Sequence, residues 1–241
     1  MKSLLTLVVV AWTVAFMVQS ALAQSGAKAI YYSESGPTVT TQPTSRGRTS
    51  VPKKSGSQVA NKQQREYMGL TYWIELIGTE GQKKRVTTDY TFRSGDRIKL
   101  HVQSNRDGYL YLVNLGSTGR SHMLFPYQGM AQGNTVKANV EYEVPYTEHI
   151  LFDQSPGEET LLVMLSSTPM GEILQPGDIR PASLSTEDTA RLLANVKEKG
   201  AKDLILETDT TSTRPASYAV APLASLKAGG MMTLHVKLKH Q

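Results

Sequence analysis

One stretch decides the fold: Asp96-Arg-Ile-Lys-Leu-His-Val-Gln-Ser-Asn-Arg-Asp-Gly-Tyr-Leu-Tyr-Leu-Val113. Its first half alternates apolar and polar side chains, which places Ile98, Leu100 and Val102 on one face. A period of two predicts a half-buried antiparallel strand. The second half is apolar on both faces and predicts a central strand. The Asp-Gly pair at 107–108 is typical of a hairpin turn, so the two strands are expected to pair.

Further strands are predicted on both sides of this hairpin. Alternating segments lie at 135–144 and 232–239, and a fully apolar segment lies at 161–165. Stretches rich in aromatic and β-branched residues lie at 69–77 and 86–92. Turn residues separate these runs. Strands at this spacing predict a mainly β protein, an antiparallel β-sandwich of the immunoglobulin-like or jelly-roll-like kind.

One peripheral helix is predicted near residues 185–199. Ser185 is a good N-cap, and Asp188 follows three residues later in a pattern close to a capping box. Leu192 and Val196 share one face of this helix. We expect that face to pack on one of the sheets or over an open end of it.

The first 23 residues have the three parts of a cleaved signal peptide. Lys2 supplies the positive start, residues 4–17 are apolar apart from two threonines, and Ala21-Leu22-Ala23 is a small-x-small cleavage site. This pattern predicts export to the periplasm or out of the cell, with cleavage after Ala23. The alternative is a retained anchor, but the apolar core is shorter than the roughly 20 residues that a spanning helix needs.

Residues 24–68 differ in composition from residues 69–241. They are rich in Ser, Thr, Gly and Lys and hold few large apolar residues, which predicts a disordered linker before a folded β-sandwich domain. The linker contains seven basic and two acidic residues, a net charge of +5, so the basic charge of the chain lies there. It could contact anionic envelope polymers or lipid headgroups, or serve as a plain solubilising tether.

Several elements around the hairpin occur in the order of a known family. They are Phe92, the Gly-Asp pair at 95–96, the Asn-x-Asp-Gly-Tyr-Leu-Tyr hairpin at 105–111, Leu124-Phe125-Pro126, and Pro156-Gly157-Glu158-Glu159. This order resembles the bacterial domain of unknown function 4384 family, over residues 85–170. Similar domains occur in exported or envelope proteins, sometimes beside enzyme or signalling domains. No catalytic residues are established for the family, so none can be transferred to this chain. The chain carries the domain without a recognisable catalytic partner, which favours a stand-alone binding or structural role.

The sequence carries no motif for catalysis or metal binding. Its lack of cysteine excludes disulfides, thiolate metal sites and a cysteine nucleophile. The five histidines lack metal-ligand spacing, and His101 and His235 are expected on outward, solvated faces. There is no Gly-x-Ser-x-Gly elbow and no phosphate-binding loop. We therefore expect no metal, no cofactor and no enzymatic activity. Nucleic acid is not an expected partner, because the folded part is close to neutral.

Candidate binding residues lie around the hairpin and the aromatic segment that follows it. Aromatic side chains beside polar groups suit contacts with sugars or proteins. The alternative for the two strand tyrosines is that they belong to the core, with their hydroxyls bonded at its rim. The candidates are Arg106, Asp107, Tyr109, Tyr111, Phe125 and Tyr127.

These features predict an exported, non-catalytic β-sandwich module of the cell envelope that binds a protein partner or an envelope polymer. The alternative is an envelope hydrolase with a Ser/His/Asp site assembled from distant segments.

Overall fold

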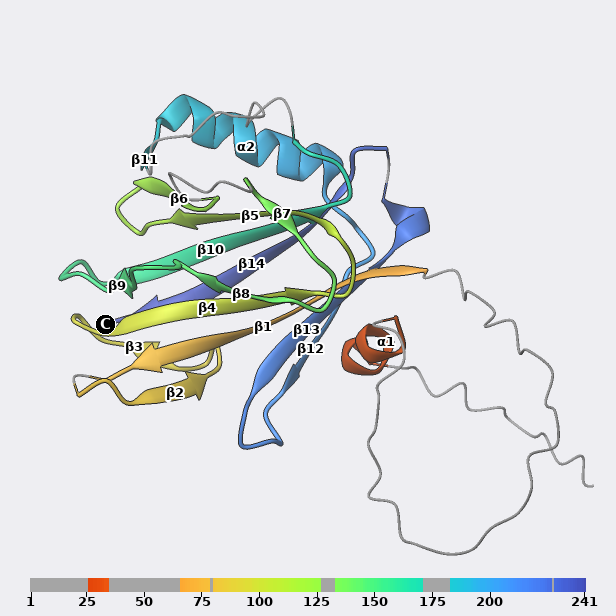
Figure 1. Cartoon of the computed structure of the whole chain (residues 1–241). Helices are drawn as coiled ribbons and strands as arrows, with labels where there is room; N and C mark the ends of the chain where they lie inside the picture. The colour runs from red at the N-terminus through yellow and green to blue at the C-terminus, as the bar shows by residue number, and fades with distance from the viewer. Residues whose placement is uncertain (1–25, 35–65, 79, 127–132, 171–182, 227) are drawn as a thin grey trace, which may run out of the picture.

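Two β-sheets packed face to face form the body of the molecule, as the computed structural model shows (Figure 1). The structure describes residues 26–34, 66–78, 80–126, 133–170, 183–226 and 228–241. The predicted mainly β class and sandwich arrangement are confirmed. Within the described residues, no helix is long and apolar enough to span a bilayer.

The first sheet, sheet A, has the strand order β12-β13-β1-β4-β8, with β2 also pairing with β1 and β9 with β4. All of its pairings are antiparallel. Its strands are β1 (Tyr67–Ile77), β2 (Lys83–Val86), β4 (Arg97–Ser104), β8 (Glu141–Val144), β9 (Ile150–Leu151), β12 (Ile205–Asp209) and β13 (Ala216–Pro222).

The second sheet, sheet B, has the order β11-β6-β5-β10-β14-β3, with β7 also pairing with β5. Its pairings are antiparallel except that of β14 with β3, which is parallel. Its strands are β3 (Thr91–Phe92), β5 (Gly108–Leu115), β6 (Ser121–Phe125), β7 (Thr135–Val136), β10 (Gly157–Ser166), β11 (Ser183–Leu184) and β14 (Met231–His240). A 3₁₀ turn, Leu223–Ser225, lies between β13 and β14.

The core between the sheets follows the alternation of the strands. Ile98, Leu100 and Val102 are buried in it, as their period of two predicted. Leu110 and Leu112 of β5 face them from sheet B. The aliphatic side chains of β10 and β14 complete this core, so each sheet contributes one apolar face.

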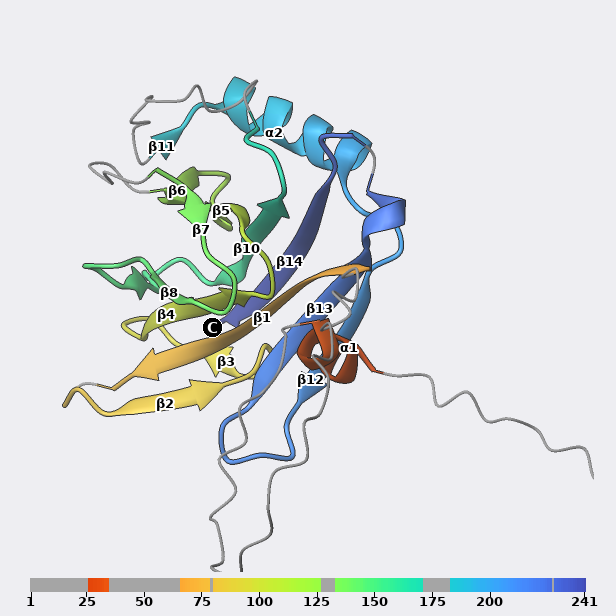
Figure 2. The same cartoon turned by 45° about the vertical axis from the view of Figure 1, so that its right-hand side comes forward.

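The predicted helix is present as α2 (Thr186–Lys199) and lies over the outer face of sheet B (Figure 2). Ser185 caps it: its Oγ accepts a hydrogen bond from the backbone N of Asp188 at 3.0 Å. Leu192 is fully buried against the outer residues of β5 and β10. This contact explains why β5 and β10 are apolar on both faces.

A second helix, α1 (Ala27–Glu34), lies in the segment that was predicted to be a disordered linker, so this part of the prediction is wrong. It packs on the outer face of sheet A, beside β13 and β12 (Figure 2). Tyr31 is only 2% exposed and lies over Gly69, where an added Cβ would be 2.9 Å from the tyrosine ring. Residues 1–25 and 35–65 lie outside the described residues, so the signal peptide and the rest of the linker stay predictions.

Candidate functional site

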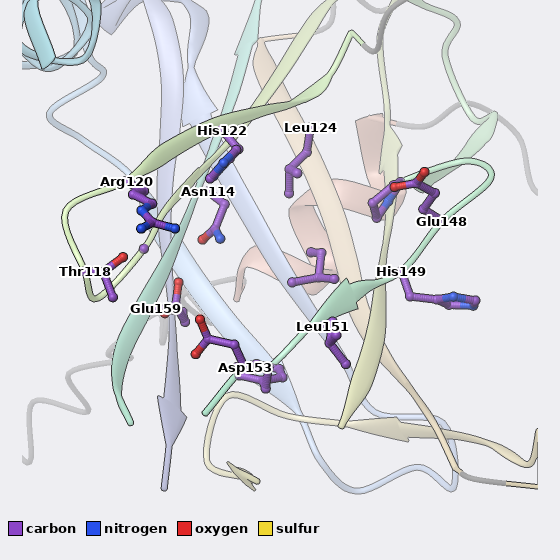
Figure 3. Close-up of a pocket in the computed structure, with 14 residues that line it drawn as sticks. Asn114, Thr118, Arg120, His122, Leu124, Glu148, His149, Leu151, Asp153 and Glu159 are labelled. Carbon is purple, nitrogen blue, oxygen red and sulfur yellow. The ribbon is translucent and has the colours of Figure 1, made fainter. Parts of the chain in front are cut away.

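A pocket of about 280 Å³ opens between the two sheets, on the side where β8 and β9 face β5 and β6 (Figure 3). One wall is the β5–β6 hairpin with the start of β10, and the other is the segment that leads from β8 through β9. The lining residues are Asn114, Gly116, Thr118, Arg120, His122, Leu124, Pro145, Glu148, His149, Ile150, Leu151, Phe152, Asp153 and Glu159.

The most informative polar group of the pocket is the amide of Asn114. Asn114 follows Leu110 and Leu112 on β5 at a spacing of two, so its side chain points between the sheets. Among the described residues, its buried Oδ1 has no hydrogen-bond partner. A buried carbonyl oxygen without a donor costs about 1–3 kcal/mol. A donor group from a ligand would remove that cost.

The β5–β6 hairpin is held in place by a carboxylate of sheet B. Glu159 Oε1 accepts hydrogen bonds from the backbone N of Ser117 at 3.0 Å and from its Oγ at 2.9 Å. Gly119 adopts a φ of +79°, which suits glycine, and its N donates to Gly116 O at 2.9 Å. The tight turn places Thr118 and Arg120 at the rim of the pocket (Figure 3).

The opposite wall is anchored by Phe152, which is buried in the core. Its ring stacks on Phe92 with centroids 4.5 Å apart. Its backbone N donates to Asp96 O at 3.0 Å, and its O accepts from Gly95 N at 2.8 Å. These contacts attach this part of the wall to the core.

The lining combines an apolar floor with converging polar groups. Leu124 and Ile150 contribute aliphatic surface, whereas one guanidinium, two imidazoles, three carboxylates and the Asn114 amide supply donors and acceptors. Pockets of this composition bind small or extended ligands by burying apolar surface and orienting polar groups.

The two predicted tyrosines do not line this pocket. Tyr111 is buried on the outer face of sheet B, where its hydroxyl accepts a hydrogen bond from Met170 N at 2.9 Å. Burial raises the pKa of Tyr111. Tyr109 packs partly buried against the same cluster, near α2. The interpretation of Tyr111 as a core residue with a bonded hydroxyl is therefore confirmed.

The structure describes three of the other four candidates. Phe125 is buried in the core on the inner face of sheet B. Asp107 in the turn pairs with Lys137 Nζ at 2.9 Å, and the backbone N of Arg106 donates to Ser104 Oγ at 3.1 Å. Tyr127 lies outside the described residues. Tyr111 and Phe125 lie on opposite faces of sheet B, so the candidates that the structure describes do not form one binding surface.

The sequence did contain a signal for the pocket that the prediction did not use. Asn114 and Glu159 lie two residues from the core residues Leu112 and Leu161 and therefore on the same inner face of their strands, and His122 is paired with Asn114. Polar side chains at inward positions are unusual, because burying them is costly. Their convergence could not be predicted, since it depends on how β5, β6 and β10 pair.

The hydrolase alternative has one matching contact. Ser94 Oγ lies 3.2 Å from His240 Nε2. Among the residues that the structure describes, no carboxylate forms a hydrogen bond with this histidine. A serine nucleophile needs a histidine that is oriented by a third group, so the pair is not a triad.

The fold and this pocket define a two-sheet sandwich with a ligand-sized cavity between its sheets. Residues 91–169 match the family described as Domain of unknown function (DUF4384), which confirms the resemblance found in the sequence. The match runs from β3 to the segment after β10 and contains every residue that lines the pocket. No curated protein and no solved structure matches the chain.

Proposed function

We propose that this protein is an exported, non-catalytic module of the cell envelope that binds a partner in the pocket between its sheets. The ligand is a segment of a protein or an envelope polymer that carries amide N–H or hydroxyl groups. The observation that carries the proposal is Asn114, which lines the pocket and whose buried Oδ1 has no hydrogen-bond partner among the described residues. An N–H or O–H group of the ligand would supply the missing hydrogen bond.

Two features of the sequence support export. Residues 1–23 have the pattern of a signal peptide, and cleavage after Ala23 would place the mature N-terminus three residues before α1. N-terminal sequencing of the secreted or periplasmic protein should read Gln24 as its first residue. Recovery of the uncleaved chain from the cytoplasm would contradict export.

The mature protein can be tested for binding with a photo-crosslinking amino acid placed at the pocket rim. We expect substitution at Thr118 to capture an envelope component. Substitution at Arg191, on the solvent side of α2, should not capture it. Asn114→Leu should abolish the capture at position 118. It should not lower the thermal midpoint, because it removes a buried unsatisfied oxygen. Equal capture at both positions, or capture that survives Asn114→Leu, would contradict the proposal.

A further inference from the structure

The outer face of sheet A holds a second cluster of polar side chains, away from the pocket between the sheets. Glu75 of β1, His101 of β4 and Glu143 of β8 lie on three neighbouring strands. In the register of the sheet, His101 is opposite Glu143, and Glu75 is opposite Lys99, two residues before His101. One potential metal-ligand atom from each of the three residues lies within 4.8 Å of the others.

The orientation of His101 is the key observation. Its Nδ1 lies 2.8 Å from Glu141 Oε1, so the ring is placed to donate Nδ1–H to that carboxylate. In the neutral form of the ring, this contact leaves the lone pair on Nε2, because a neutral imidazole carries one donor and one acceptor. The side chain is only 8% exposed, and among the described residues Nε2 has no hydrogen-bond partner. Nε2 lies 3.7 Å from Glu75 Oε1.

A buried imidazole nitrogen that faces carboxylates is stabilised by a cation between them, which is either a proton on the ring or a bound metal ion. We propose that Glu75, His101 and Glu143 bind a divalent transition-metal ion of the zinc class. Glu141 orients the histidine from the second shell, as carboxylates commonly do for metal-binding imidazoles.

The ligand set points to zinc rather than to calcium or magnesium. One imidazole nitrogen and two carboxylate oxygens suit a borderline ion, whereas calcium and magnesium prefer oxygen ligands alone. A tetrahedral ion with bonds of about 2.0–2.1 Å separates its ligand atoms by about 3.4 Å. The 3.7 Å between His101 Nε2 and Glu75 Oε1 is close to that value. Three protein ligands would leave a fourth position for water or an exogenous group.

The imidazole is held in place without the metal. Trp73 stacks on it with ring centroids 5.1 Å apart and an interplanar angle of 10°. The guanidinium of Arg85 lies 3.9 Å from the Trp73 ring. β2, which carries Arg85, and β4, which carries His101, pair with opposite edges of β1. The histidine is therefore preorganised, which reduces the entropy lost on binding.

Two lysines compete for the same carboxylates. Lys83 Nζ lies 2.8 Å from Glu75 Oε1, and Lys99 Nζ lies 2.5 Å from Glu143 Oε1. Lys99 also donates to Tyr146 O at 3.0 Å. These ammonium groups balance the negative charge in the absence of metal, and they must move when the ion binds. They weaken the site, so removal of one lysine should strengthen it.

Trp73 provides a local reporter, because the only other tryptophan is Trp12 in the predicted signal peptide. Tag-free mature protein is titrated with Co²⁺ or Ni²⁺ while its fluorescence is recorded, and zinc binding is measured by calorimetry. We expect saturable quenching at one equivalent and competition by zinc. His101→Gln should abolish the quenching, whereas His235→Gln, an exposed histidine of sheet B, should not change it.

Two further variants separate metal binding from a structural role. Glu141→Gln should weaken binding about tenfold or more through the second shell. Lys83→Met should tighten binding, a gain that misfolding cannot produce. Absence of saturable quenching in the wild-type protein would overturn the proposal. The same conclusion would follow if His101→Gln and His235→Gln behaved alike, or if Lys83→Met left the affinity unchanged or lower.

Discussion

The outer faces of the two sheets differ sharply, although their inner faces build one common core. The part of the outer face of sheet B that lies under α2 is apolar, and Tyr111, Leu162 and Met164 are buried there in a cluster that includes Leu192 of α2. The outer face of sheet A is covered by α1 over parts of β12, β13 and β1, and the region around His101 carries charged residues.

The difference teaches what each face contributes. An apolar face covered by a helix stabilises the sandwich through burial. Charged and polar side chains that are largely buried cost desolvation energy and add little stability. Their presence on sheet A is the reason for the proposed metal site.

The largest expected effect on stability comes from truncating the buried leucine of α2, the helix that covers part of the outer face of sheet B. Leu192→Ala should lower the free energy of unfolding by about 3 kcal/mol, because it leaves a cavity under α2. The neighbouring Leu193 is 39% exposed, so Leu193→Ala serves as the control and should cost well below 1 kcal/mol. Denaturant unfolding of both variants measures the difference. Equal losses would mean that α2 does not seal this face.

The next largest effect on stability is expected from α1, the helix that covers part of the outer face of sheet A. Tyr31→Ala should cost about 2 kcal/mol, because the ring fills the space above Gly69 and packs edge-on against Tyr218. Tyr32 is 50% exposed, and Tyr32→Ala should cost much less. Thermal unfolding compares the two variants. If both matched the wild type, α1 would be a passive part of a linker, as the sequence predicted.

Substitutions in the charged part of sheet A should lower the stability less than those in the apolar contacts of the two helices. Lys99→Met leaves Glu143 without its ion-pair partner and should cost about 1 kcal/mol, since Glu143 is partly solvated. The double variant Lys99→Met/Glu143→Leu should recover most of that loss. Chemical denaturation of the single and double variants forms the test. A double variant that is much less stable than the single one would show that this ion pair holds the sheet together.

The smallest effect concerns the ion pair between α1 and β12. The hydrogen bond from Lys28, followed by those from Thr211, holds the pKa of Asp209 well below its usual range. A carboxyl group whose pKa is lower in the folded protein stabilises the folded state at any pH above its unfolded pKa of about 3.9. That stabilisation is lost as the pH falls from there through the folded pKa. The difference in thermal midpoint between wild type and Asp209→Asn should therefore be constant from pH 7 to 5 and shrink below about pH 4. A difference that changes between pH 7 and 5 would point to another group.

The two faces also differ in how far the sequence predicted them. The alternation at 96–103 correctly assigned Ile98, Leu100 and Val102 to the core, and the Ser185 cap located α2. Both signals are local, because period and capping depend on neighbouring residues. α1 was not predicted because it is only eight residues long. In addition, Tyr31 is buried through contacts with β1 and β13, which are distant in the sequence.

The burial of His101 among carboxylates could not be predicted either, because it depends on contacts between residues that are distant in the sequence. Alternation correctly placed it on the outer face of its strand, but it was expected to be solvated there. Glu75 and Glu141 lie 26 and 40 residues away in the chain and reach it only because β1 and β8 flank β4. Strand order is set by long-range pairing, which no local pattern encodes.

The most direct test of why sheet A keeps a polar outer face is anomalous X-ray diffraction at the zinc edge from crystals of the mature protein grown with Zn²⁺. We expect one peak between Glu75, His101 and Glu143, with ligand distances of about 2.0–2.2 Å and both lysines displaced from the carboxylates. Diffraction that shows no peak there, with Lys83 and Lys99 still paired to the two glutamates, would contradict this account.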